Sequence, residues 1–130
     1  MVMGVYEASV EQAFRARHAI RLADGSVEQP HEHLWRVTAS FRAESLDDTM
    51  GVVIDFLEVQ TVLKSIADKL KGKDLSAIEA FAGGSSAERV AEFIAGELQT
   101  KIDATAKLHR VSVTEAEGCS ASFYPDGPCT

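Results

Sequence analysis

The most informative segment of the chain is Gln29-Pro30-His31-Glu32-His33-Leu34-Trp35-Arg36-Val37-Thr38-Ala39-Ser40-Phe41. From His31 onward, the odd positions carry two histidines and then apolar side chains, whereas the even positions are mostly polar. This alternation predicts a β-strand with one buried face. His31 and His33 both lie on that face. Because side chains two apart on a strand point the same way, one metal ion can contact both imidazoles.

An earlier segment, residues 6–18, alternates in the same manner and places His18 at the end of its apolar face. The turn-forming tripeptide 24–26 (Asp-Gly-Ser) lies between the two segments. Antiparallel pairing would therefore bring His18 beside His31 and His33. Three neutral imidazoles with an open fourth position are typical of a catalytic zinc site. From the residues alone, core histidines satisfied by backbone carbonyls are an equally good interpretation.

The composition restricts the class of protein. A chain of 130 residues fits a single domain over residues 1–130, and its net charge of −7 argues against a nucleic-acid partner. No apolar run is long enough to span a bilayer, so we expect no membrane partner and a cytoplasmic protein. Cys119 and Cys129 lack metal-ligand spacing. The sequence neither supports nor excludes a disulfide between them. Arginines around the two histidine segments are compatible with an anionic small molecule.

The middle of the chain predicts two helices. Asp55 and Glu58 form a capping box before an apolar stripe at helical spacing, which consists of Phe56, Val59, Leu63, Ile66 and Leu70. Lys71-Gly72-Lys73 ends this helix. Ser85 and Glu88 form a second capping box for a helix over about residues 86–103. Its expected buried face is Ala87, Ala91, Ile94, Leu98 and Ile102.

Two further strands are expected at residues 108–116 and 120–124, with Val111 and Val113 on the same face as Glu115. The element order is then β-β-α-α-β-β. Strands and helices do not alternate, so a parallel sheet is disfavoured. The fold class is α+β, with a four-stranded antiparallel sheet and two helices on one face.

These motifs together resemble the 6-pyruvoyltetrahydropterin synthase family, which includes the 6-carboxytetrahydropterin synthases of the queuosine pathway. The matching pieces, in order, are residues 14–18 (FRARH), 30–33 (PHEH), 51–56 (GVVIDF), 86–88 (SAE) and 111–115 (VSVTE). The resemblance implies the tunnelling fold, in which trimers close a barrel and stack as hexamers with sites at subunit interfaces.

The resemblance also implies site residues. Zinc would be held by His18, His31 and His33. Glu115 would anchor a pterin through its amino group and the neighbouring ring N–H, a geometry that suits a carboxylate. Ser86 would place a hydroxyl near the ring. Two alternatives to these ligand roles stay open. Glu115 could instead pair with an arginine, and Ser86 could serve only as a helix start.

The chain departs from the family pattern at the catalytic base. The usual cysteine position is Val27, and the usual Asp-His pair after the first helix aligns with Lys71-Gly72. The glycine between the two histidines is Glu32. Because some family members carry a glutamate in place of the cysteine, Glu28 is the candidate base, with Glu32 and His109 as other titratable residues nearby.

Two functions follow as hypotheses. The first is a zinc-dependent, pterin-type lyase or synthase homologue with altered substrate or chemistry. The second is a non-catalytic zinc protein that binds a pterin or purine. A purely structural zinc site would need a fourth protein ligand, and the sequence offers no histidine or cysteine at suitable spacing. Asp55 is expected to cap its helix or, alternatively, to orient a zinc-bound imidazole.

Overall fold

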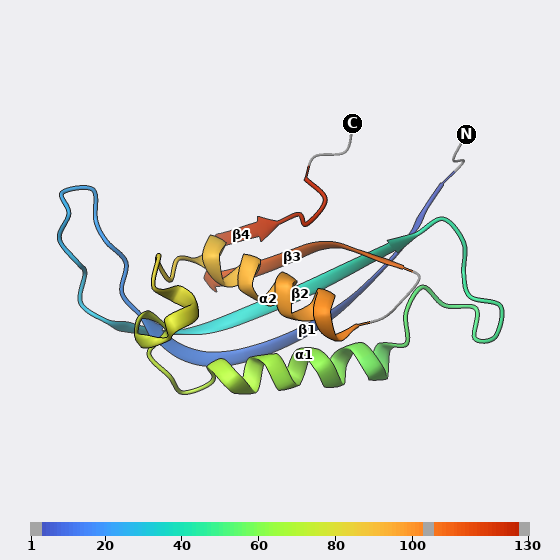
Figure 1. Ribbon diagram of the computed structural model, residues 1–130, viewed down its shortest axis with the longest axis horizontal. Coiled ribbons are helices and arrows are strands. Elements are labelled where there is room, and N and C mark those ends of the chain that lie inside the picture. The colour runs from blue at the N-terminus through green and yellow to red at the C-terminus, as the bar shows by residue number, and fades with distance from the viewer. Residues whose placement is uncertain (1–3, 103–105, 128–130) are drawn as a thin grey trace.

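The computed structural model describes residues 4–102 and 106–127. The elements are β1 (Tyr6–His18), β2 (His31–Ala43), α1 (Phe56–Leu70), η1 (Leu75–Ala77), η2 (Glu79–Phe81), α2 (Ala87–Lys101), β3 (Lys107–Ala116) and β4 (Cys119–Phe123). The four strands form one antiparallel sheet in the order β1-β2-β3-β4, and both helices lie on the same face of it (Figure 1). The predicted fold class and element order are confirmed.

The register of β1 on β2 confirms the predicted pairing of the two histidine segments. His18 is the partner of His31, and Ala16 is the partner of His33. The alternation decides which side chains face the helices, because the even residues of β1 and the odd residues of β2 share that face. The histidines therefore lie at one end of the buried face, where β1 ends and β2 begins.

The helices cover the sheet with their apolar stripes. Helix α1 packs against β1, and α2 packs against β3 and β4. The core contains Val59, Leu63, Ile66 and Leu70 from α1 and Val90, Ala91, Ile94 and Leu98 from α2. One predicted core position is wrong: Phe56 is 52 % exposed. This prediction failed because helical periodicity identifies the apolar stripe but does not show whether the sheet extends beneath the first residue of the helix. Ile102 follows α2 as its C-cap and is only partly buried.

The helix starts match the sequence signals with one correction. The Asp55 carboxylate accepts hydrogen bonds from the backbone N–H groups of Leu57 and Glu58, as an N-cap does. Helix α2 is capped by Ser86, whose hydroxyl accepts from Arg89 N, rather than by the predicted Ser85. Ser85 is buried and uses its polar groups elsewhere, so it is not available as a cap.

Two short 3-10 helices, which the sequence did not predict, close the end of the sheet that carries the histidines. Gly72 adopts φ +74°, which favours glycine, and its N–H donates to Arg15 O at 2.7 Å. This bond ties the end of α1 to β1. Leu75 in η1 and Phe81 in η2 are both buried. The segment between the helices is thereby packed beside the end of β1 (Figure 1).

Candidate metal centre

Three imidazoles gather where β1 ends and β2 begins. The ring centroids lie 4.6 Å apart for His18 and His31, 5.2 Å for His18 and His33, and 4.5 Å for His31 and His33. Two causes produce this arrangement: the cross-strand pairing of His18 with His31, and the two-residue spacing within β2. The structure thus brings together all three residues predicted from the sequence as metal ligands.

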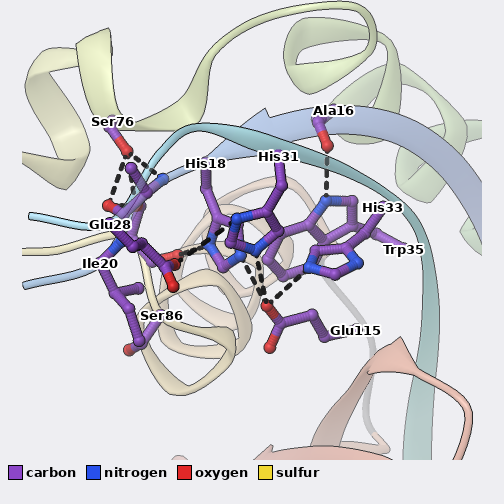
Figure 2. A network of polar contacts seen from close by, with 12 residues as sticks. Ala16, His18, Ile20, Glu28, His31, His33, Trp35, Ser76, Ser86 and Glu115 are labelled. Atoms are coloured by element: carbon purple, nitrogen blue, oxygen red, sulfur yellow. Dashed lines mark hydrogen bonds and ion pairs between the residues drawn. The ribbon is translucent and has the colours of Figure 1, made fainter. Parts of the chain in front are cut away.

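Glu115 reaches the same point from β3. Its Oε1 lies 2.5 Å from His18 Nε2, 3.0 Å from His33 Nε2 and 4.0 Å from His31 Nε2. Figure 2 shows the three contacts converging on one carboxylate. One donor atom from each of the four residues lies within 4.8 Å of the other three. The four side chains therefore form one cluster of possible metal ligands.

Backbone carbonyls orient two of the rings. His18 Nδ1 lies 2.8 Å from Ser85 O, and His31 Nδ1 lies 3.1 Å from Gln29 O. A carbonyl oxygen can only accept, so each Nδ1 carries the hydrogen and donates it. The Nε2 atoms are left with their lone pairs turned toward the cluster. An N–H bound to a carbonyl on the far side is the usual arrangement of a metal-binding histidine.

Burial favours the neutral form of the His33 imidazole. His18 is 1 % exposed, and the Nε2 atoms of His18 and His33 are buried without a hydrogen-bond partner. Burial lowers the pKa of His33 below its usual value, and the neighbouring His31 and His18 lower it further against the opposing charge of Glu115. Neutral imidazole is the form that ligates metals. The donor set therefore fits a divalent ion such as zinc.

Trp35 forms the inner wall of the cluster. It is fully buried, and its indole N–H donates to Ala16 O at 3.1 Å. The ring lies edge-on to His18 and His33, with centroids 4.9 Å and 5.9 Å away. The sequence carried this signal, because Trp35 follows His31 and His33 on the same strand face. An apolar wall of this kind restricts water and fixes the imidazole rings.

Glu28 lies beside the cluster, against the other nitrogen of His31. Its Oε1 is 3.6 Å from His31 Nδ1 and accepts a hydrogen bond of 3.0 Å from Ile20 N. The carboxylate is 26 % exposed. Glu32, the alternative titratable residue, lies on the opposite face of the sheet and pairs with Arg15 at 3.7 Å. His109 contacts Tyr124 and lies on β3 outside this cluster.

A cleft of about 570 Å³ is lined by Ser85, whose carbonyl accepts from His18 Nδ1, but by none of the four cluster residues. Its walls come from the segment after β1, the η2–α2 connection and the first turn of α2, and include Ile20, Val27, Ser76, Ser86 and Arg89. Ser86 thus lines the cleft while it caps α2. The sequence analysis assigned Ser85 to a helix cap and missed its role at the site. Its carbonyl orients His18, and its hydroxyl contacts Ser76 Oγ at 2.9 Å. Two adjacent serines at a helix start were the only signal.

Comparison with known proteins identifies the family. A family model described as 6-pyruvoyl tetrahydropterin synthase matches residues 7–126. The chain belongs to this family. The 6-pyruvoyl tetrahydropterin synthase family contains lyases, and the histidine–glutamate cluster found in this member is consistent with the family's zinc site.

Solved structures of 6-pyruvoyl tetrahydropterin synthases show the same fold. The Caenorhabditis elegans protein superposes with a TM-score of 0.82 at 19 % identity, covering 95 % of this chain and 98 % of that chain. A Plasmodium vivax variant gives 0.71 at 17 % identity, with coverage of 92 % and 97 %. The Plasmodium falciparum protein gives 0.69 at 21 % identity, with coverage of 92 % and 96 %. No curated protein matches the sequence.

Two further sequence predictions concern membrane-spanning helices and the two cysteines. Neither helix within residues 4–102 and 106–127 has the length and apolar character needed to cross a bilayer. Cys119 is exposed at the start of β4, whereas Cys129, its possible disulfide partner, lies outside the described residues.

Proposed function

We propose that this protein is a zinc-dependent, pterin-type lyase or synthase homologue that acts on a dihydropterin or a related heterocycle. One observation carries the proposal. Three buried or half-buried imidazoles turn their Nε2 atoms to one point, and the opposite nitrogens of two of them donate to backbone carbonyls. His18, His31 and His33 would hold the zinc.

Zinc bound at this point would supply a Lewis acid that stabilises the negative charge developing when a C–H bond beside a carbonyl or hydroxyl loses its proton. The chain must provide the base. Glu28 is the proposed base, accepting the proton at its carboxylate, because it is the acidic side chain beside His31 Nδ1. The Plasmodium vivax relative supports this choice, since a glutamate is described as that protein's catalytic residue.

Glu115 and Ser86 are the proposed substrate-binding residues. A carboxylate can accept two parallel hydrogen bonds from the amino group and ring N–H of a pterin. Ser86 would contribute its hydroxyl from the cleft that it lines together with Ser85, whose volume of about 570 Å³ suits a small heterocycle.

The substrate is proposed to differ from that of the usual enzyme. Val27 and Lys71-Gly72 replace the cysteine and the Asp-His pair expected for proton transfer, so we expect weak or no turnover of dihydroneopterin triphosphate. The active form is proposed to be a homotrimer or hexamer with its site at a subunit interface. The outer strands β1 and β4 would supply the edges, and analytical ultracentrifugation measures the assembly.

The second candidate is a non-catalytic zinc protein that binds a pterin or purine. The position of Glu28 favours it, because that carboxylate is held by Ile20 N and faces the side of His31 away from the Nε2 cluster. A general base must lie within hydrogen-bond reach of the carbon that loses its proton. A Glu28 carboxylate that faces away from the Nε2 cluster does not meet this requirement without moving.

Turnover by the zinc-loaded protein separates the two candidates. A panel of dihydropterins is incubated with wild type, Glu28→Gln and the control Glu32→Gln, which removes an equal charge from the opposite sheet face. The lyase proposal expects product from wild type and Glu32→Gln, and a loss of at least about 100-fold in Glu28→Gln with pterin binding retained. Pterin binding without turnover by any of the three proteins would establish the binding protein instead.

A further inference from the structure

We propose that Glu115 is the fourth ligand of the metal when no small molecule is bound, so that three imidazoles and one carboxylate hold the ion. This inference rests on the proposed zinc binding and adds the identity of the remaining ligand. It also assigns Glu115 a role other than binding the heterocycle.

The distances carry the inference. A tetrahedral zinc ion with bonds of about 2.0–2.2 Å separates its ligand atoms by about 3.3–3.5 Å. Glu115 Oε1 lies 2.5, 3.0 and 4.0 Å from the three imidazole Nε2 atoms, values that bracket this separation. A carboxylate on the far side of a bound heterocycle would lie well beyond these distances. In this structure Glu115 instead occupies the position of a ligand.

Proton sharing accounts for only part of the cluster. His18 Nδ1 already donates to Ser85 O, so a second proton on Nε2 would give an imidazolium paired with Glu115. That proton would serve one ring only. The Nε2 of His33 is also buried without a hydrogen-bond partner and lies 3.0 Å from the same oxygen. One divalent cation would bind both nitrogens and the carboxylate together, whereas proton sharing would need a separate Nε2 proton on each ring.

The strand geometry explains how Glu115 reaches the cluster. Val113 and Glu115 share the inner face of β3, and Val113 pairs with Val37 of β2. The ladder with β4 becomes irregular after Thr114, so Glu115 has no regular partner there. This irregularity lies just beyond Thr114, the last β3 residue paired with β2, and a bulge commonly redirects a side chain beside a functional site.

The assignment changes how the site works. With Glu115 on the metal, an outside oxygen must displace the carboxylate or join as a fifth ligand. The heterocycle and the metal then compete for the same side chain. Anchoring of the heterocycle by both oxygens of the Glu115 carboxylate therefore requires Glu115 to leave the metal.

Metal titration of variants tests the assignment. Glu115→Gln and Glu115→Ala are compared with Glu117→Gln, which makes the same charge change at an exposed residue of the β3–β4 turn. Zinc affinity is measured by competition with a chelator of known affinity. Glu115 variants should bind zinc at least about tenfold more weakly, since even residues that only orient a ligand cost that much. Glu117→Gln should match wild type. Circular dichroism checks that each apo variant is folded.

Azide binding to wild type and to the same variants provides a second readout. In the cobalt-substituted protein, the visible absorption reports whether azide enters the coordination sphere. Azide should bind weakly to wild type and Glu117→Gln, and at least tenfold more tightly to Glu115→Ala. Equal zinc affinity and equal azide binding across all variants would overturn the assignment while leaving the three-histidine site standing. A wild type that binds no zinc would refute the proposed function as well.

Discussion

His18 and His31 are direct cross-strand partners on β1 and β2, and their ring centroids lie 4.6 Å apart. Neighbouring strands are about 4.8 Å apart, so partners on the same face bring their side chains into contact. His33 follows on that face two residues later. The candidate metal centre is therefore a direct product of the strand register. A one-residue slip would move His31 and His33 to the opposite face, away from His18.

Removing one ligand histidine should abolish tight metal binding. For His33→Ala, we expect the zinc dissociation constant to rise by more than about 100-fold, because a direct ligand contributes more than the residues that orient it. Isothermal titration with zinc measures the change. His109→Ala is the matched control, since His109 lies on β3 outside the cluster and contacts Tyr124. Equal zinc affinity in the two variants would contradict the ligand assignment.

Ser85 should stabilise both the fold and the metal site. Its buried hydroxyl contacts Ser76 Oγ at 2.9 Å and donates to Ala19 O at 3.3 Å. Ser85→Ala removes both bonds and is expected to cost about 1–3 kcal/mol in free energy of unfolding. Because the adjacent carbonyl orients His18, zinc affinity should fall about tenfold. Chemical denaturation and zinc titration measure the two effects. Ser65→Ala, on an exposed position of α1, should stay within about 0.5 kcal/mol.

The two roles of Ser86 can be separated by substitution. Ser86→Ala removes the N-cap of α2 and should cost about 1 kcal/mol, whereas Ser86→Asp keeps a capping oxygen and should retain stability. If the hydroxyl also binds the heterocycle, both variants should weaken pterin binding measured by fluorescence titration. Pterin affinity unchanged in Ser86→Asp would leave Ser86 with the capping role only.

The free energy of unfolding of the apo protein should fall as the pH drops below about 6.5, which is the ordinary pKa of a histidine side chain. Burial lowers the pKa of His109, and the nearby Arg42 and Arg110 lower it further. The unfolded chain then binds more protons than the folded chain between the two pKa values, so stability rises with pH in that window. His109→Gln should reduce the slope of unfolding free energy between about pH 7 and 5. The same slope in wild type and His109→Gln would contradict this account.

The sequence predicted most of the fold because burial leaves a periodic trace. The alternation in β1 and β2 identified the inner face and the three histidines together, and helical spacing identified α1 and α2. Elements without a period were missed, including the two 3-10 helices around Leu75 and Phe81. The choice of Ser86 rather than Ser85 as the cap depended on a tertiary contact with Ser76 that no local pattern contains.

The arrangement of the site was only partly predictable. The spacing of His31 and His33 placed them on one face, and the resemblance supplied Glu115. The approach of Glu115 to the imidazoles depends on cross-strand distances and on the irregular ladder after Thr114. The position of Glu28 depends on a hydrogen bond to Ile20 across the connection between β1 and β2. The spacing of residues along the sequence predicts neither the position of Glu115 nor that of Glu28.

A crystal structure of the zinc-loaded protein, with anomalous data collected at the zinc edge, tests the central claim most directly. The account predicts one anomalous peak per chain, about 2.0–2.1 Å from the Nε2 atoms of His18, His31 and His33. The claim would be contradicted by a fully zinc-treated crystal with no peak at this position, or by a peak that is not bonded to these three histidines.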